Sequence, residues 1–365
     1  MKIEELNEGF YEKLLTIWEK LNASLELDYI LRNAMAYLEE VLEAERSSIW
    51  ELDEQKEELF FRVFSGGDRD KVEEIRLKIG EGVAGHTAMT SAPVIIEDAE
   101  NSRLWSVKVD ERTHFQTKSI LSVPLLFREK VVGVVQLINK KNGGVFTGRD
   151  LRSVEMMCIP IATALVNAKL FKELEQTFME TALALADAIE KRDRYTAGHT
   201  RRVTRYAMWI AEEINLPAAE KKWLALSGIL HDIGKIGIRD NILNKDGPLG
   251  SVEFETMKQH TVFGAEIVEK IHSLGKVVGG ILYHHEKMDG SGYPKGLKGE
   301  EIPLFARIIS VADTYDAMTT DRPYRKGLSS EEATKELEKM SGSQFDPDMV
   351  AAFLRRIPRE VRDEN

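Results

Sequence analysis

The sequence predicts two domains of different class, an α+β domain followed by an all-α domain, joined by a long helix. Strand-like apolar runs occur only between residues 47 and 139, and helical spacing alone follows residue 182. The length of 365 residues also exceeds what one ordinary core organises. The expected divisions are an N-terminal helix over 1–24, the α+β domain over 25–170, a connector helix over 171–181 and the all-α domain over 182–365.

Composition and charge narrow the classes of function. The formal net charge of -11 argues against nonspecific binding of polymeric nucleic acid, so binding of a phosphate-bearing substrate needs a local basic patch. The single cysteine, Cys158, excludes an intramolecular disulfide and fits a reducing cytoplasm. The charged start Met1-Lys2-Ile3-Glu4-Glu5 is unlike a signal peptide, and no apolar run approaches the length of a bilayer span. We expect a cytoplasmic protein without a membrane segment.

An apolar stripe at helical spacing runs along the first residues of the chain. Its members follow one another at intervals of three and four: Ile3, Leu6, Phe10, Leu14, Ile17 and Leu21. The stripe would pair with its twin in a second copy or pack on the domain behind it, and both interpretations stay open.

Residues 25–170 combine one leading helix with several short strands. The helix is expected over 27–42, and the strand-like runs are 47–52, 59–64, 94–97, 120–127 and 131–139. Helical stretches close both ends. This layout predicts an α+β sandwich with one antiparallel sheet.

Three spaced motifs in this domain carry a family resemblance. The segment Gly80-Glu81-Gly82-Val83-Ala84-Gly85-His86 allows tight turns at the mouth of a pocket. Together with the runs over 119–125 and 133–140, it resembles a GAF domain, a small-molecule-sensing module, over about residues 25–170. The resemblance implies a small-molecule ligand. A ligand-free dimerisation scaffold is the alternative.

GAF domains that bind cyclic nucleotides carry an Asn-Lys, Phe and Asp-Glu signature. Asn139, Lys140, Phe146 and Asp150 match it, whereas Leu151 replaces the glutamate. That departure leaves cyclic-nucleotide binding by this domain open.

The stretch from 150 to 194 forms one helical seam. Apolar residues lie three or four apart from Val154 through Cys158 to Ile189. Pro160 predicts a kink or a break, because it removes one backbone donor. We expect the seam to connect the two domains and to pair across a homodimer.

The remainder of the chain predicts only helices. They are expected over 182–192, 198–214, 218–233, 251–271, 275–287, 304–319, 330–340 and 347–355. Ser329 and Glu332 form a capping box for one of them.

A histidine and an aspartate, His231 and Asp232, follow the apolar residues of the helix expected over 218–233. Buried imidazole and carboxylate groups are costly unless something binds them. On a helix the two residues lie about 100° apart, so both can reach one cluster. Six of the eight histidines fall between residues 199 and 285, and clustered nitrogen and carboxylate ligands suit transition metals.

Lys235 follows on the same helical face, three residues after Asp232. Its ammonium could hold a phosphate oxygen or the leaving group. An ordinary cation at a helix C-terminus is the other interpretation.

These residues carry a second and more specific resemblance. His199, His231-Asp232, His260, His284-His285, Gly292-Tyr293-Pro294 and Val311-Ala312-Asp313 resemble an HD-GYP domain, a branch of the HD phosphohydrolases, over about residues 180–360. The resemblance implies a metal-dependent phosphodiesterase that hydrolyses cyclic di-GMP to pGpG or GMP. A hydroxide bridging two cations would attack phosphorus in line.

Residue roles follow from this resemblance. One metal would take His199, His231, Asp232 and Asp313, and the other would take Asp232, His260, His284 and His285. Lys235 and Asp232 would be catalytic, and substrate contacts would come from Arg322, Arg325 and Tyr293. Asp316, three residues after Asp313, is expected to orient a ligand.

The number of metals depends on Tyr195. By the resemblance, members that hold three metals carry a glutamate four residues before the first histidine ligand, where this chain has Tyr195. A neutral phenol replaces a carboxylate poorly around such cations. Glu190 and Asp193 lie nearby at other spacings. We expect two divalent transition-metal ions, iron or manganese.

Two other functions stay open. An HD hydrolase of another nucleotide or cyclic dinucleotide would keep His231-Asp232 but has no reason to carry the Gly292-Tyr293-Pro294 loop. A catalytically weak cyclic di-GMP receptor or redox sensor would keep every ligand.

Overall fold

The computed structural model describes residues 27–65, 75–104, 115–193, 198–321 and 326–363. The chain divides into two compact units, residues 1–174 and 175–365. The helix expected over 1–24, Tyr195, Arg322 and Arg325 lie outside the described residues.

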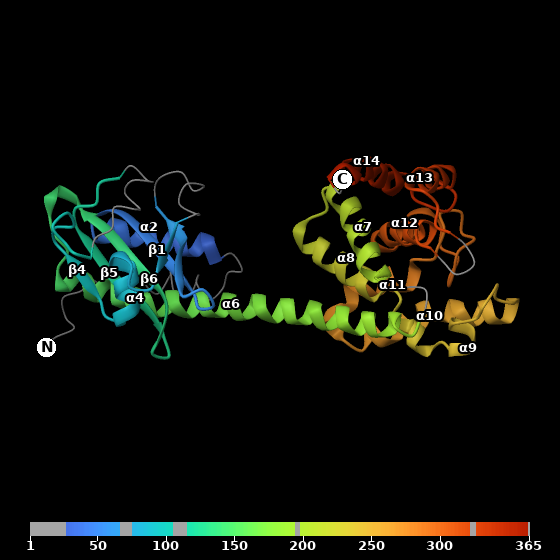
Figure 1. Cartoon of the computed structure of the whole chain (residues 1–365), viewed down its shortest axis with the longest axis horizontal. Coiled ribbons are helices and arrows are strands. Elements are labelled where there is room, and N and C mark those ends of the chain that lie inside the picture. The colour runs from blue at the N-terminus through green and yellow to red at the C-terminus, as the bar shows by residue number, and fades with distance from the viewer. Residues whose placement is uncertain (1–26, 66–74, 105–114, 194–197, 322–325, 364–365) are drawn as a thin grey trace. The chain divides into compact units, whose positions relative to one another are not determined.

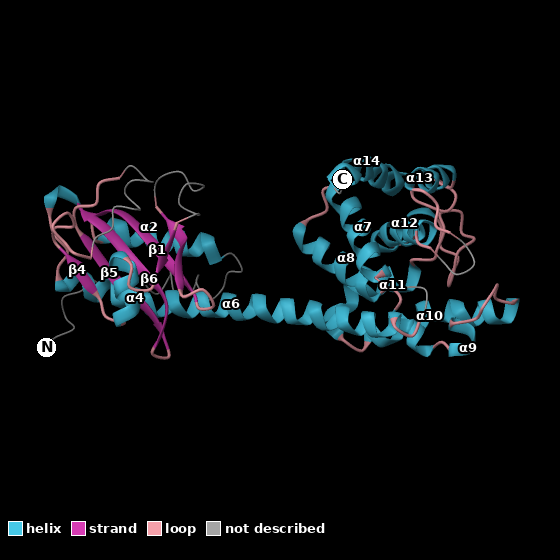
Figure 2. Ribbon diagram, in the orientation of Figure 1, coloured by secondary structure: helices cyan, strands magenta, loops and turns pink. Residues whose placement is uncertain are grey.

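The first unit contains one antiparallel sheet, as predicted, with six strands where the sequence indicated five (Figure 1, Figure 2). Its spatial order is β3-β2-β1-β6-β5-β4. The strands are β1 (Ala44–Asp53), β2 (Glu58–Phe64), β3 (Arg76–Lys78), β4 (Val94–Ile96), β5 (Ile120–Phe127) and β6 (Lys130–Lys140). The sequence did not predict β3, because Arg76-Leu77-Lys78 offers one apolar residue between two charged ones, whereas the equally short β4 is a run of three apolar residues.

Helices cover both faces of this sheet. On one face, α2 (Leu27–Val41) and the start of α6 (Gly148–Glu190) pack against alternate residues such as Ile49 and Val135. On the other face, α4 (Gly82–Thr90) packs against Trp50 and Val134. The alternation of neighbouring residues between the two cores follows the period of two along a strand.

The glycine-rich segment makes a turn and also lies close to the backbone of Lys78. Helix α4 begins at Gly82, within the segment predicted as a turn. A Cβ at Gly85 would lie 2.4 Å from the carbonyl oxygen of Lys78, so only glycine fits there.

The four residues that match the GAF signature form structural contacts. The Oδ1 atom of Asn139 accepts hydrogen bonds from two backbone N–H groups just before β5. Lys140 donates to Asp150 at 2.8 Å and thereby ties the end of β6 to the start of α6. Phe146 is buried in the core, and Leu151 packs against that core from its edge.

Helix α6 continues through Pro160 without the break that the sequence suggested. Residues on both sides of the proline, Met157, Cys158 and Ile161, are buried in the first core and hold the backbone there. Apolar side chains farther along are exposed: Leu170, Phe171, Leu174, Phe178 and Leu185.

Among the described residues, α6 is the one helix long and apolar enough to cross a membrane. This corrects the expectation that no apolar run approaches that length. The helix also buries Val154, Ile161 and Leu165 in the core of the first unit, which accounts for much of its apolar composition.

The second unit is helical, and its described residues form no strand of the sheet (Figure 2). Its helices are α7 (His199–Glu213), α8 (Ala218–Leu230), α9 (Asp240–Leu243), α10 (Ser251–Glu269), α11 (Gly275–Tyr283), α12 (Leu304–Thr319), α13 (Ser330–Lys339) and α14 (Pro347–Asp363). The capping box of Ser329 and Glu332 at α13 is confirmed.

Two cores organise this unit. Helices α7, α12 and α14 meet at the rings of Tyr206, Tyr315 and Phe353. The end of α6 packs with α8, α10 and α11 around residues such as Leu226 and Ile281.

Two of these helices end earlier than predicted, and each ends directly before a histidine of the candidate site. Helix α8 ends at Leu230, directly before His231, and α11 ends at Tyr283, directly before His284. A short 3-10 helix, η2 (Ile233–Gly237), follows the first of these and crosses α10 closely. A Cβ at Gly234 would lie 1.8 Å from the carbonyl oxygen of His260, so glycine is required at this crossing.

Candidate metal centre

The seven side chains predicted to bind metal converge in the second unit. His199 begins α7, His260 lies within α10, and Asp313 lies within α12. The pairs His231-Asp232 and His284-His285 directly follow α8 and α11. The packing of these helices therefore brings residues more than a hundred positions apart to one place.

One group consists of His199, His231 and Asp313. One potential ligand atom from each residue lies within 4.8 Å of the others. The Nε2 atom of His199 lies 3.4 Å from Oδ1 of Asp313. This spacing suits a single cation with mixed nitrogen and oxygen ligands.

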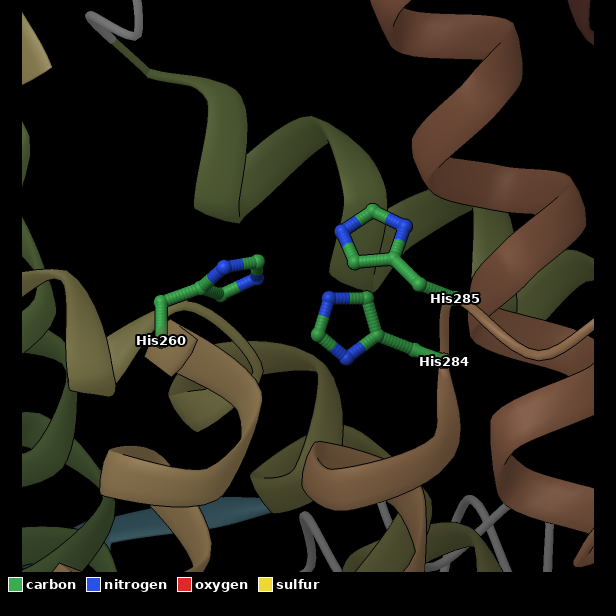
Figure 3. A group of neighbouring side chains, drawn as sticks. All are labelled: His260, His284 and His285. Carbon is green, nitrogen blue, oxygen red and sulfur yellow. The ribbon is translucent and has the colours of Figure 1, made fainter. Parts of the chain in front are cut away.

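A second group consists of His260, His284 and His285, whose side chains turn toward one another (Figure 3). Their potential ligand atoms also lie within 4.8 Å of one another. The rings of His284 and His285 have centroids 4.1 Å apart, and His260 lies 5.2 Å from His285 by the same measure. The group offers three imidazole nitrogens to one position.

Asp232 lies between the two groups and presents one oxygen to each. Its Oδ2 atom is 3.4 Å from Nε2 of His231 and 3.7 Å from Nε2 of His199. Its Oδ1 atom is 3.5 Å from Nε2 of His260. This is the placement that a carboxylate bridging two cations requires.

Backbone carbonyl groups fix three of the imidazoles. The Nδ1 atoms of His231, His260 and His284 each donate to the carbonyl three residues earlier, at 2.7, 2.6 and 2.7 Å. A carbonyl oxygen can only accept, so Nδ1 carries the hydrogen. Among the described residues, the buried Nε2 atoms of all three lack a hydrogen-bond partner. An unpartnered buried nitrogen is costly, and a metal ion would satisfy it.

His199 is oriented by a carboxylate, as predicted for Asp316. Its Nδ1 atom lies 2.7 Å from Oδ2 of Asp316, which is buried. Arg202 donates to both oxygens of that carboxylate, at 2.5 and 3.0 Å. These contacts aim Nε2 of His199 at the first group.

The second group is electrically neutral. Burial and the neighbouring imidazoles hold the pKa of His284 well below its ordinary value. Burial, reinforced by His260, lowers the pKa of His285 to about 4. Burial also lowers the pKa of His260, against the opposing charge of Asp232. Neutral imidazole is the form that binds metal.

Charged side chains lie in and beside the first group. Burial lowers the pKa of His231, but the charges of Asp232 and Asp313 raise it more, to about 9. Burial acts to raise the pKa of Asp232, yet Lys235 and His231 hold it well below its ordinary range. The carboxylate of Asp232 is therefore ionised and ready to bind a cation.

Lys235 lies in η2 rather than on the helix of His231, and still reaches the centre. Its Nζ atom is 2.9 Å from Oδ2 of Asp232 and 2.9 Å from Oδ2 of Asp193. Sequence reasoning noted Asp193 only as a nearby carboxylate, because no spacing rule links it to Lys235. Burial opposes the charge of Lys235, but the two carboxylates raise its pKa above the ordinary value.

The Gly292-Tyr293-Pro294 loop lies against the second group. The ring of Tyr293 lies 4.9 Å from that of His285, measured between centroids. Glu286, a buried residue that sequence reasoning missed, accepts hydrogen bonds from three successive backbone N–H groups, 295 to 297. Its position beside His284-His285 and before a Gly/Pro loop was the available signal.

Comparison with known proteins identifies two domains. Residues 26–165 match the family model described as GAF domain. Residues 184–349 match the family model described as HD domain.

Three relatives are similar to this chain over about half of its length. The chain is 43% identical over 197 residues to a cyclic di-GMP phosphodiesterase of Thermotoga maritima, covering 53% of each chain. It is 35% identical over 188 residues to a 3'3'-cGAMP-specific phosphodiesterase of Vibrio cholerae, covering 50% of this chain and 40% of the relative. It is 41% identical over 185 residues to a cyclic di-GMP phosphodiesterase response regulator of Xanthomonas campestris, covering 50% and 49%. The chain spans about half the length of the curated relatives it matches.

Proposed function

We propose that this protein, whose chain joins a GAF domain at residues 26–165 to an HD domain at residues 184–349, is a metal-dependent phosphodiesterase of cyclic di-GMP. The observation that carries the proposal is Asp232, whose two oxygens face two separate groups of ligands. The names of the relatives in Thermotoga maritima and Xanthomonas campestris support the choice of substrate. The products would be pGpG or GMP.

The proposed centre holds two divalent transition-metal ions, iron or manganese. Mixed imidazole and carboxylate ligands support this class of metal. One ion would bind His199, His231 and Asp313, the other would bind His260, His284 and His285, and Asp232 would bridge them. When bound, the ions supply an activated water and neutralise charge on the phosphoryl group.

The contacts of the nearby carboxylates support two ions rather than three. Glu190 accepts hydrogen bonds from the backbone N–H groups of Gly198 and Thr200 at the start of α7. Asp193 is engaged with Lys235. These contacts give both carboxylates other roles, which supports the absence of a third ion.

Other side chains would act on the substrate. Lys235, held between Asp193 and Asp232, would stabilise negative charge on the phosphoryl group as it is attacked. Tyr293 would contact the substrate beside the second group. Arg322 and Arg325 would hold the second phosphate, because an arginine fork matches phosphate geometry.

The first domain would regulate the second. GAF domains bind small ligands, and α6 runs from the core of the GAF domain to Glu190, which caps the helix that begins with His199. We also propose a homodimer paired through the exposed apolar residues of α6, and a location in the cytoplasm. Neither polymeric nucleic acid nor a membrane would be a partner.

A second candidate substrate is 3'3'-cGAMP, because one relative is named as specific for it. A catalytically weak receptor would use the same centre without turnover. Both alternatives predict different outcomes in one experiment.

The test is incubation of purified, metal-loaded protein with cyclic di-GMP, 3'3'-cGAMP or cyclic di-AMP, followed by nucleotide chromatography. We expect fastest hydrolysis of cyclic di-GMP, and loss of both metal and activity in His231→Ala and Asp232→Ala. Faster hydrolysis of 3'3'-cGAMP would change the substrate. Full metal content with normal turnover in either variant would overturn the site.

A further inference from the structure

A row of aromatic rings leads from the second ligand group toward solvent. The Tyr293 ring lies 4.9 Å from His285 and 6.3 Å from Phe254 between centroids. Phe254 lies near the start of α10, the helix that also carries His260, and its side chain is 45% exposed. The partly exposed ring of Phe254 is therefore separated from the ligand group of His285 by the ring of Tyr293.

A cation lies beside this row. Lys258 follows Phe254 by one helical turn, so the two side chains share a face of α10. Its Nζ atom is 4.9 Å from the centroid of Phe254 and 5.5 Å from that of Tyr293. It also pairs with Glu255 at 2.7 Å. An ammonium has three hydrogens, so this pair leaves donors for a ligand.

Core packing does not account for the two rings. Neither Phe254 nor Tyr293 belongs to any hydrophobic cluster of the described residues. Glu286 instead holds the loop of Tyr293 through three backbone hydrogen bonds, which fixes that ring next to His285. The arrangement is a preformed corner of two rings at 81° to each other, with one cation beside both, so a base can stack on one ring and meet the other edge-on.

We propose that Phe254, Tyr293 and Lys258 form the subsite for one guanine base of the substrate, an inference that rests on the proposed function. Purine bases stack on aromatic side chains. Lysine donates to the O6 and N7 acceptors of guanine. Adenine carries an amino donor in place of O6, so Lys258 favours guanine over adenine.

Variants of Phe254 test the stacking surface. Phe254→Ala raises KM for cyclic di-GMP about 5- to 150-fold, because stacking on one aromatic ring contributes about 1–3 kcal/mol. Metal content and the turnover of saturating bis(4-nitrophenyl) phosphate, which carries no base, stay unchanged. Phe254→Trp restores a low KM. Val252→Ala is the matched control, since Val252 is 82% exposed near the start of the same helix.

Lys258 tests the preference between bases. Lys258→Met lowers kcat/KM for cyclic di-GMP about tenfold and lowers kcat/KM for cyclic di-AMP by less, because both bases present N7 but only guanine presents O6 beside it. Equal losses with both substrates would contradict the assignment of Lys258.

Binding gives a readout that does not depend on turnover. A cyclic dinucleotide carrying 2-aminopurine in place of one base loses fluorescence when that base stacks. Quenching should occur with wild type and Phe254→Trp and disappear with Phe254→Ala.

The possible failures are distinct. If Phe254→Ala matches Val252→Ala in KM and quenching, the subsite is wrong while the phosphodiesterase stands. If Phe254→Ala loses metal or the base-free activity, the role of Phe254 is structural and the subsite is also wrong. If the metal-loaded wild type hydrolyses no phosphodiester, the proposed function fails and the subsite fails with it.

Discussion

The Nζ atom of Lys235 lies 2.9 Å from Oδ2 of Asp193, a residue 42 positions earlier in the chain. The same Nζ atom lies 2.9 Å from Oδ2 of Asp232. Asp193 follows the end of α6, and Arg192 beside it donates to the backbone carbonyls of Ile236 and Ile238, just beyond Lys235. The turn after α6 thus holds Lys235 at the metal centre.

We expect Lys235→Met to keep both metals and to lower kcat about 100-fold, because one preorganised positive group at the reacting phosphate is lost. Steady-state kinetics and elemental analysis on the same preparation check this. Metal loss as large as in Asp232→Ala would show that Lys235 serves the ligands instead.

Asp193→Asn should weaken the ion pair that positions Lys235 without removing a proposed metal ligand. We expect kcat to fall about tenfold, and KM and metal content to stay unchanged. The double variant should lose no more kcat than Lys235→Met alone, since the two residues act as a unit. The matched control is Asp187→Asn, whose carboxylate pairs with the exposed Arg201 on the surface. Additive losses in the double variant would contradict the coupling.

Asp316→Asn should lower metal affinity about 10- to 100-fold, because the carboxylate that orients His199 loses its charge. Competition with a chromogenic chelator measures this affinity. Asp346→Asn is the control, since Asp346 is buried in an ion pair with Arg307 and should change stability alone. Equal chelator sensitivity in Asp316→Asn and wild type would contradict the prediction.

The sequence predicted which side chains converge at the candidate site better than it predicted their surroundings. Histidine and aspartate are costly in a core, so His231, Asp232 and the paired His284-His285 stood out from composition and spacing alone. Asp316 was also accessible, because three residues on a helix return to one face. The bridging position of Asp232 and the partner of Lys235 depend on how α8 and the turn after α6 end, and periodicity does not predict those ends.

The same limit applies to local structure. The antiparallel sheet was predictable from its apolar runs, whereas β3 offers only Leu77 between two charged residues. Helix α4 starts inside a glycine-rich segment because Gly85 must approach Lys78, which is a tertiary requirement. Pro160 suggested a break that packing of its neighbours overrides.

Acid should destabilise the first domain partly through Asp150. Burial acts to raise the pKa of Asp150, but bonds from Lys140 and Thr147 lower it below its ordinary value. A lowered pKa means that the contribution is present above about pH 4, the unfolded value, and is lost as pH falls through the folded pKa. We expect Asp150→Asn to cost about 1–3 kcal/mol at pH 7, and less below pH 4.

Calorimetry of the full chain between pH 3 and pH 8 measures this, following the transition that EDTA leaves unchanged. Glu97→Gln, an exposed carboxylate of the same domain, is the control. A loss in Asp150→Asn that is independent of pH would contradict the role of the charge.

The exposed stripe of α6 predicts a homodimer. Phe171, Leu174 and Phe178 follow the three-four spacing of a paired helix, and all are exposed in the single chain. Leu174→Glu should shift the dimer toward monomer at micromolar concentration by light scattering. Gln176→Glu, on the opposite face of the helix, should remain dimeric. A monomeric wild type would refute the pairing.

The measurement that tests the central claim most directly is a metal titration of the chelator-treated protein, followed by hydrolysis of cyclic di-GMP at each step. The account predicts no turnover without metal, and a rise that reaches its plateau at two ions per chain, with neither binding nor turnover restored in Asp232→Ala. Full turnover in metal-free protein, or a plateau at one or three ions, would contradict the two-metal centre bridged by Asp232.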